Sequence, residues 1–127
     1  MPTEKITALL DEWSAALQSC DPARITDLYA PDAVLLPTIS YQIRLDPAQI
    51  RRYFRNMMQM GPSARFNEVH SRLFDTIAIN SGIYTFRLHR DDGSSYDLIC
   101  RFTFVYKLLD DAWKIIEHHS STMPDQP

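Results

Sequence analysis

The chain has 127 residues, a formal net charge of −3, 45% hydrophobic residues and 23% charged residues, which are the values of one globular domain. An acidic balance argues against a general nucleic-acid binder, because phosphate backbones select basic faces. No apolar run approaches the roughly 18 residues that a membrane span requires, and no basic region with a following apolar run opens the chain. We therefore expect one cytoplasmic domain over residues 1–127, with 124–127 as a loose tail.

The cysteine pattern predicts neither a disulfide framework nor a metal centre. Cys20 and Cys100 are the two cysteines, and they lie far apart and outside any Cys-x-x-Cys spacing. This usage is typical of free thiols in a reducing compartment. We expect no metal and no cofactor, because the chain offers no set of ligands at metal-binding spacing.

Three helices are predicted in the first half of the chain. Residues 3–19 carry apolar side chains at helical spacing, which predicts one buried stripe. Asp21-Pro22 and Asp46-Pro47 each place a capping residue before a proline at the first helical position. They predict helices over about 22–29 and 47–60. The last of these has the apolar face Ile50, Tyr53, Phe54, Met57 and Met58.

The remainder is rich in strand-forming residues. A short strand is predicted at 33–37, with 41–44 as its partner. Longer strands are predicted at 66–79, 83–88, 96–109 and 113–120, separated by turn signals at 80–82, 91–93 and 110–111. Short connections favour an antiparallel meander. Helices segregated from such a sheet give an α+β fold, in which a bent sheet leaves a cone-shaped space for core side chains or a ligand.

Several segments resemble a known family. Residues 21–38 resemble the opening of nuclear-transport-factor-2-like (NTF2-like, SnoaL-like) domains. Residues 81–86, 101–106 and 113–124 resemble bacterial members of the calcium/calmodulin-dependent protein kinase II association-domain family, most specifically in the ending His118-His119-Ser120-Ser121-x-Met123-Pro124. The resemblance implies a cone-shaped half-barrel with three N-terminal helices on a curved antiparallel sheet, and homodimers or larger rings built on the open sheet face.

The resemblance does not imply kinase activity. The chain has no Gly-rich phosphate loop, no His-Arg-Asp loop and no Asp-Phe-Gly motif. The animal domains line their pocket with arginines, and the matching positions here are Tyr84, Phe104 and Ser120, while Arg101 stands where they carry an acidic residue. An anion-selective pocket is therefore not carried over by the resemblance.

The last predicted strand ends in polar residues whose facing depends on register. Alternation separates His118 from His119, so the two cannot both bind one metal. A two-residue turn at 110–111 pairs Leu108 with Trp113 and Phe102 with His119. That register places His119 on the apolar face, whereas one extra bulge would exchange the two faces.

Three residues are candidates for acid–base chemistry. Glu117 and His119 lie two apart on one face, where a carboxylate can orient an imidazole as a general base. The alternative is a solvated strand end or an interface. Asp32 could work with His119, as in isomerases and cyclases of related folds, although an acidic residue there commonly caps a turn.

The candidate ligand contacts are arginines and tyrosines. Arg101 interrupts an apolar strand and, if buried, needs a counter-charge from Glu117, Asp97 or a ligand carboxylate. Further candidates are polar-tipped side chains on elements that should face the helices, for which the sequence favours core packing over ligand contact: Tyr41, Arg44, Tyr53 and Tyr84.

Three hypotheses about function follow. The first is that the cone binds a small, partly polar organic molecule through Arg101, His119 and Tyr84, with acid–base chemistry as its only foreseeable reaction. The second is a non-catalytic assembly module. The third is a relic of the fold whose cone is filled.

Overall fold

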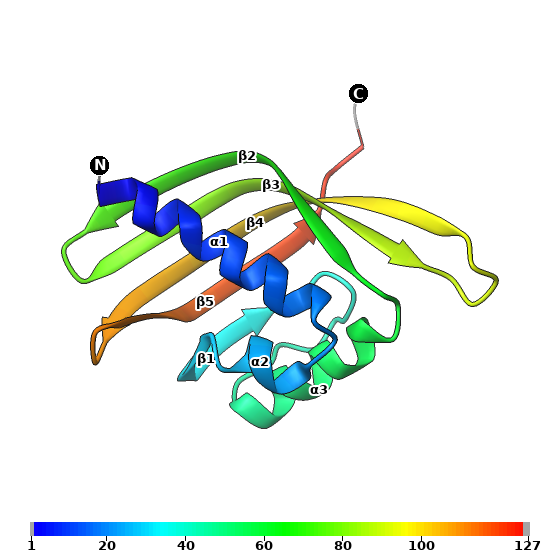
Figure 1. Ribbon diagram of the computed structural model, residues 1–127, viewed down its shortest axis with the longest axis horizontal. Coiled ribbons are helices and arrows are strands. Elements are labelled where there is room, and N and C mark those ends of the chain that lie inside the picture. The colour runs from blue at the N-terminus through cyan, green and yellow to red at the C-terminus, as the bar shows by residue number, and fades with distance from the viewer. Residues whose placement is uncertain (1, 126–127) are drawn as a thin grey trace.

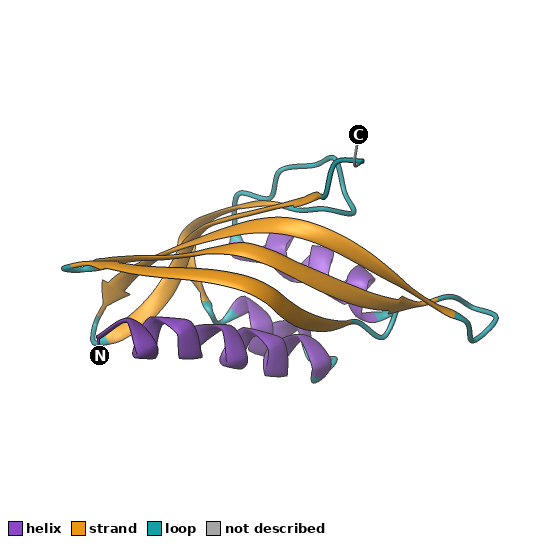
Figure 2. Ribbon diagram, turned by 90° about the horizontal axis from the view of Figure 1, so that it is seen from above, coloured by secondary structure: helices purple, strands orange, loops and turns teal. Residues whose placement is uncertain are grey.

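The computed structural model describes residues 2–125. In chain order the elements are α1 (Pro2–Gln18), α2 (Pro22–Thr26), β1 (Tyr29–Leu36), α3 (Pro47–Met58), β2 (Ser63–Phe74), β3 (Ile77–His89), β4 (Ser95–Leu109) and β5 (Ala112–Thr122). The strands form one sheet in the order β1-β5-β4-β3-β2. Helix α1 crosses the sheet, and α2 and α3 lie together beside β1 (Figure 1). The sheet is bent, with α1 along one face (Figure 2), so the predicted α+β architecture is confirmed.

The helix starts arise from the two predicted caps. The Asp21 carboxylate accepts from the Ala23 backbone N–H at 3.1 Å, and the Asp46 carboxylate accepts from the Gln49 N–H at 2.8 Å. Helix α2 ends at Thr26 and α3 at Met58, two to three residues before the predicted ends. The whole predicted apolar face of α3 is buried. Local signals therefore determine where these helices begin and which face they bury.

One predicted turn is wrong. Residues 80–82 lie inside β3, and the chain reverses instead at Asp75 and Thr76. Gly82 lies against the bulge that shifts the β2 register between Phe66 and Glu68. A Cβ at position 82 would stand 1.9 Å from the Glu68 carbonyl oxygen. The glycine is present because the two backbones approach closely, and not because the chain turns.

The first strand is longer and differently paired than predicted. It begins at Tyr29 and runs parallel to β5, which departs from a purely antiparallel sheet. The predicted partner strand at 41–44 is reduced to a single bridge between Leu35 and Arg44. The segment after β1 is therefore a loop with one backbone bridge to the strand that precedes it.

The β4–β5 hairpin has the predicted turn but not the predicted register. Asp110 and Asp111 both have positive φ, at 49° and 66°, as the tightest hairpin turns require. Leu108 pairs with Trp113 as expected, but the register shifts between Val105 and Tyr106. Phe104 then pairs with His118, and Phe102 pairs with Ser120 instead of His119. The bulge turns His118 inward and His119 outward.

Candidate functional site

His118 lies at the centre of the interior. Its side chain is only 2% exposed and stacks on Phe104 with ring centroids 3.9 Å apart. The Nδ1 atom lies 2.8 Å from the Tyr29 hydroxyl, and Nε2 lies 3.2 Å from the Tyr84 hydroxyl. Both imidazole nitrogens are therefore hydrogen-bonded to buried tyrosines.

The hydrogen bonds of this network run in one direction. The Tyr84 hydroxyl donates to Ser120 Oγ at 2.6 Å, so it must accept from His118 Nε2–H. Nδ1 then accepts from the Tyr29 hydroxyl, which itself accepts from Trp13 Nε1–H at 3.1 Å. This pattern assigns His118 as a neutral imidazole with its proton on Nε2.

The network continues from Ser120 toward the mouth of the cone. The Ser120 hydroxyl hydrogen-bonds the Thr38 hydroxyl, and Thr38 Oγ1 donates to Cys100 Sγ at 3.8 Å. Burial also raises the pKa of the Cys100 thiol. The neutral thiol in turn donates to the Leu98 carbonyl oxygen at 3.7 Å, so the chain of donors and acceptors passes into the backbone of β4.

Burial keeps the network uncharged. It lowers the pKa of His118 to about 3, with a smaller contribution from the nearby His119. Burial likewise raises the pKa of both Tyr29 and Tyr84 well above the ordinary tyrosine value. At neutral pH these groups hold fixed hydrogen bonds and carry no charge, which suits them to order the core.

The interior leaves almost no free space. A cavity of about 10 Å³ remains among the side chains of the network, bounded by Trp13, Tyr53, Tyr84, His118 and Ser120. That volume is close to the smallest that can hold one water molecule. Trp13 fills the middle of the cone, stacked on Tyr84 at 5.9 Å and edge-on to Phe104 at 5.3 Å. A small organic molecule has no room in this interior unless side chains move.

Most of the predicted polar site residues lie elsewhere. Arg101 and His119 are exposed, and Glu117 is half-buried. Arg101 alternates with the buried Cys100 and Phe102, so its side chain projects from the sheet face turned away from the helices. Asp32 is exposed in the irregular part of β1. The roles predicted for these four residues stay predictions. Of the three polar contacts in the first hypothesis, only Tyr84 lies in the interior of the cone.

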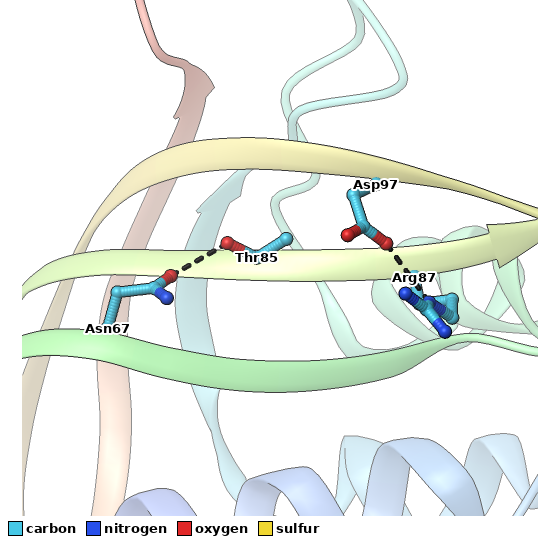
Figure 3. A network of polar contacts seen from close by, with 4 residues as sticks. All are labelled: Asn67, Thr85, Arg87 and Asp97. Carbon is cyan, nitrogen blue, oxygen red and sulfur yellow. Dashed lines mark hydrogen bonds and ion pairs between the residues drawn. The ribbon is translucent and has the colours of Figure 1, made fainter.

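The two counter-charges suggested for Arg101 do not bind it. Asp97 pairs with Arg87 at 3.0 Å, and the Thr85 hydroxyl beside them donates to Asn67 at 2.7 Å (Figure 3). The Arg87 guanidinium lowers the pKa of the Asp97 carboxyl by hydrogen bonding. Within residues 2–125, Arg101 forms no ion pair, with Glu117 or otherwise.

The structure does bring Arg44 and Tyr53 together. The Arg44 guanidinium carbon lies 5.6 Å from the Tyr53 ring centroid, and both side chains line a cleft of about 250 Å³ beside α3. Tyr41, from the same loop as Arg44, is instead 96% exposed. The candidates Arg44 and Tyr53 thus share one site, and Tyr41 and Tyr84 do not belong to it.

Most of the interior network was not predicted from the sequence. His118 was considered only as a metal ligand, and Tyr29 and Trp13 were assigned to helices without chemistry. The available signal was the spacing His118-x-Ser120, which becomes an inward pair once a bulge is allowed. In the part of the chain that the structure describes, no three His, Cys, Asp or Glu side chains gather as a metal site. No helix described there is both long and apolar enough to cross a membrane.

Comparisons with known proteins agree on one family. The model of the calcium/calmodulin dependent protein kinase II association domain matches residues 3–124. A solved association-domain structure of this kind from Xanthomonas campestris has 43% identity and a TM-score of 0.93, and the match covers 96% of this chain and 88% of that one. No curated protein matches the sequence.

More distant structures share the fold alone. An NTF2-like protein with a cystatin-like fold from Novosphingobium aromaticivorans has 12% identity and a TM-score of 0.80, covering 97% of this chain and 82% of that one. An NTF2-like superfamily protein from Salmonella enterica has 14% identity and a TM-score of 0.81, covering 98% and 93%. The cone is therefore an NTF2-like fold.

Proposed function

Because this chain belongs to the calcium/calmodulin dependent protein kinase II association-domain family, we propose that it is an assembly module whose copies associate through the outer face of the sheet. The observation that carries the proposal is the placement of charge. Arg101, Glu117 and His119 project from that face, while the cone behind it is filled. A closed interior leaves the outer face as the surface available for a partner.

The composition of this face suits a self-complementary interface. Half-buried apolar residues alternate with charges of both signs, and Ile99 is 49% exposed. Apolar residues on the outer side of β3 and β4 include Ile79, Ile83, Ile99 and Val105. In a two-fold dimer each copy presents the same patch, so the patch must offer apolar area together with both charges.

The register suggests where the two-fold axis lies. Thr103 is paired with His119, and Arg101 and Glu117 lie two residues to either side of that pair, on β4 and β5 respectively. An axis that crosses the strands at the Thr103–His119 pair brings Arg101 of one copy to the level of Glu117 of the partner subunit. In this arrangement Glu117 of the partner subunit supplies the counter-charge that Arg101 lacks within residues 2–125 of its own chain.

Charge reversal tests this proposal. Light scattering of the wild-type protein should give at least twice the 14.7 kDa chain mass. Arg101→Glu should weaken association by at least tenfold, because like charges then meet across the interface, and adding Glu117→Arg should restore it. Arg51→Glu, an exposed change on α3, is the matched control and should leave the mass unchanged. A wild-type protein that is monomeric at all concentrations would refute the assembly role.

We also propose binding of a small molecule as a second candidate function, at the cleft beside α3 and not in the cone interior. Arg44 favours it, because this residue is only 8% exposed and has no carboxylate partner within residues 2–125. Acid–base turnover receives less support, since the interior imidazole is neutral and both of its nitrogens are engaged.

A further inference from the structure

The cleft beside α3 contains one positive charge, that of Arg44, and no negative charge among its described lining residues. Arg44 is only 8% exposed. It is the one charged residue among the described residues that line the cleft. A buried charge is costly unless an opposite charge or a full set of hydrogen bonds compensates it. The acidic residue nearest in sequence, Asp46, uses its carboxylate to cap α3. Beyond the Tyr53 ring and its two hydrogen bonds, the positive charge in the cleft has no carboxylate partner among the described residues.

The guanidinium is also incompletely hydrogen-bonded. Nη2 donates to Ser40 Oγ at 3.0 Å, and Nη1 donates to the Gln49 carbonyl at 3.3 Å. Both acceptors are neutral, and the buried Nε–H has no acceptor. A guanidinium has five N–H donors in a planar fork, whose geometry matches a carboxylate. Arg44 thus keeps donors for an acceptor that the described chain does not supply.

The rest of the cleft is small and largely apolar. Its volume of about 250 Å³ is below the roughly 300–1,000 Å³ of pockets for drug-sized ligands. Ile39, Met57 and Met60 form an apolar wall, and Ser40 and Asn56 add neutral polar groups. Tyr53 stays neutral, because burial raises its pKa to about 12. An acid with a short aliphatic chain fits this combination of one cation and an apolar wall.

We infer that this cleft binds a small organic acid, with the carboxylate on Arg44 and the aliphatic part against Met57 and Met60. The inference rests on the second proposed function and names its ligand class. The alternative is that Arg44 serves only to hold the loop of residues 37–46 in place, through Gln49 on α3 and through Ser40 within the loop itself. If Arg44 only fastens the loop, the protein should not bind a carboxylate from solution. A direct binding measurement therefore distinguishes the two roles.

The test is a titration followed through the methionine methyl signals in NMR. Pentanoate should move the Met57 and Met60 signals and leave that of Met123, which lies in the C-terminal segment. Pentanamide has the same size without the charge and should bind at least tenfold more weakly. Arg44→Gln should weaken pentanoate binding at least tenfold, Arg44→Lys should retain part of it, and the exposed α3 change Arg52→Gln should retain all of it.

A second variant keeps the inference testable if Arg44→Gln does not fold. Asn56→Trp leaves Arg44 in place and fills the cleft from an exposed helix position, so it should abolish the methyl shifts. Equal pentanoate binding by wild type and a folded Arg44→Gln protein would overturn the inference. Equal binding of pentanamide would refute the carboxylate class but leave a ligand cleft, whereas no shift with either compound would refute the second proposed function as well.

Discussion

At His118, burial and hydrogen bonding both favour the neutral imidazole. Protonation would place a charge against Phe104 and between two tyrosine hydroxyls, with no carboxylate among its hydrogen-bond partners. Nδ1–H would then have to donate to a Tyr29 hydroxyl that already accepts from Trp13. The neutral ring therefore stabilises the core at neutral pH, and its protonation in acid destabilises the fold.

This environment predicts a pH dependence of stability. An unfolded histidine titrates near 6.5, whereas the pKa of His118 in the fold is lowered to about 3. Between these values the unfolded chain binds a proton that the fold excludes. The contribution to the free energy of unfolding is therefore complete above about pH 6.5 and declines as pH falls, by about 1.4 kcal/mol per pH unit.

Urea unfolding between pH 7.5 and 4.5 checks the prediction. His118→Gln removes the titrating ring while keeping an amide donor and acceptor, so its stability should fall less steeply with pH than that of the wild type. His89→Gln, at an exposed position of β3, is the matched control and should keep the wild-type slope. Parallel curves for the wild type and His118→Gln would show that His118 does not titrate in this way.

At the scale of the elements, the β2–β3 pair depends on one glycine. The β2 bulge brings the Glu68 carbonyl so close to position 82 that a Cβ would lie 1.9 Å from the oxygen and 2.7 Å from the carbonyl carbon. Both atoms belong to backbone held by the sheet ladder, so neither can rotate away. We expect Gly82→Ala to lower the free energy of unfolding by about 1–3 kcal/mol.

The matched control is the residue before it. Ser81→Ala changes a half-buried position on the same strand without a backbone clash, and it should cost less than about 1 kcal/mol. Chemical unfolding of both variants provides the comparison. If Gly82→Ala were as stable as Ser81→Ala, the close approach of β2 and β3 at the bulge would not be a constraint on the sequence.

The helices were predictable because their signals are local. An aspartate before a proline satisfies free N–H groups of the first turn wherever it occurs, and the α3 face follows from helical spacing alone. The strand faces were less predictable, since a single extra residue in β5 exchanges inside and outside. That bulge lies between Val105 and Tyr106 in the register with β5, and no turn signal or glycine in β5 marks it in the sequence.

The candidate site shows the same division. Of the four polar-tipped side chains expected to face the helices, Tyr84, Arg44 and Tyr53 are buried, whereas Tyr41 is 96% exposed. Their roles as ligand contacts stay predictions. The loop in which Arg44 lies could not be foreseen, because its position depends on the single bridge to Leu35 and on the Gln49 and Ser40 acceptors. Glycine at 82 was read as a turn because a turn and a close backbone approach leave the same residue type in a sequence.

At the scale of the whole molecule, the core is complete within one chain. Trp13 packs in the middle of the cone and the remaining cavity is about 10 Å³, so a partner is not needed to bury the interior. The outer sheet face can then serve association without being part of the folding core. A variant that separates the copies should remain a folded monomer, and the stability gained by association should add to that of the monomer.

Association by this face makes thermal stability depend on protein concentration. For a dimer whose dissociation accompanies unfolding, each tenfold increase in concentration stabilises the folded state by about 1.4 kcal/mol per dimer, which raises the melting midpoint by roughly 2–4 °C. Arg101→Glu should melt at a lower midpoint that changes less with concentration, while Arg51→Glu should follow the wild type. Differential scanning calorimetry over a hundredfold concentration range measures this directly. A wild-type midpoint as constant as that of Arg101→Glu would mean that the sheet face does not hold copies together, since mass action requires the shift wherever the folded state is the associated one.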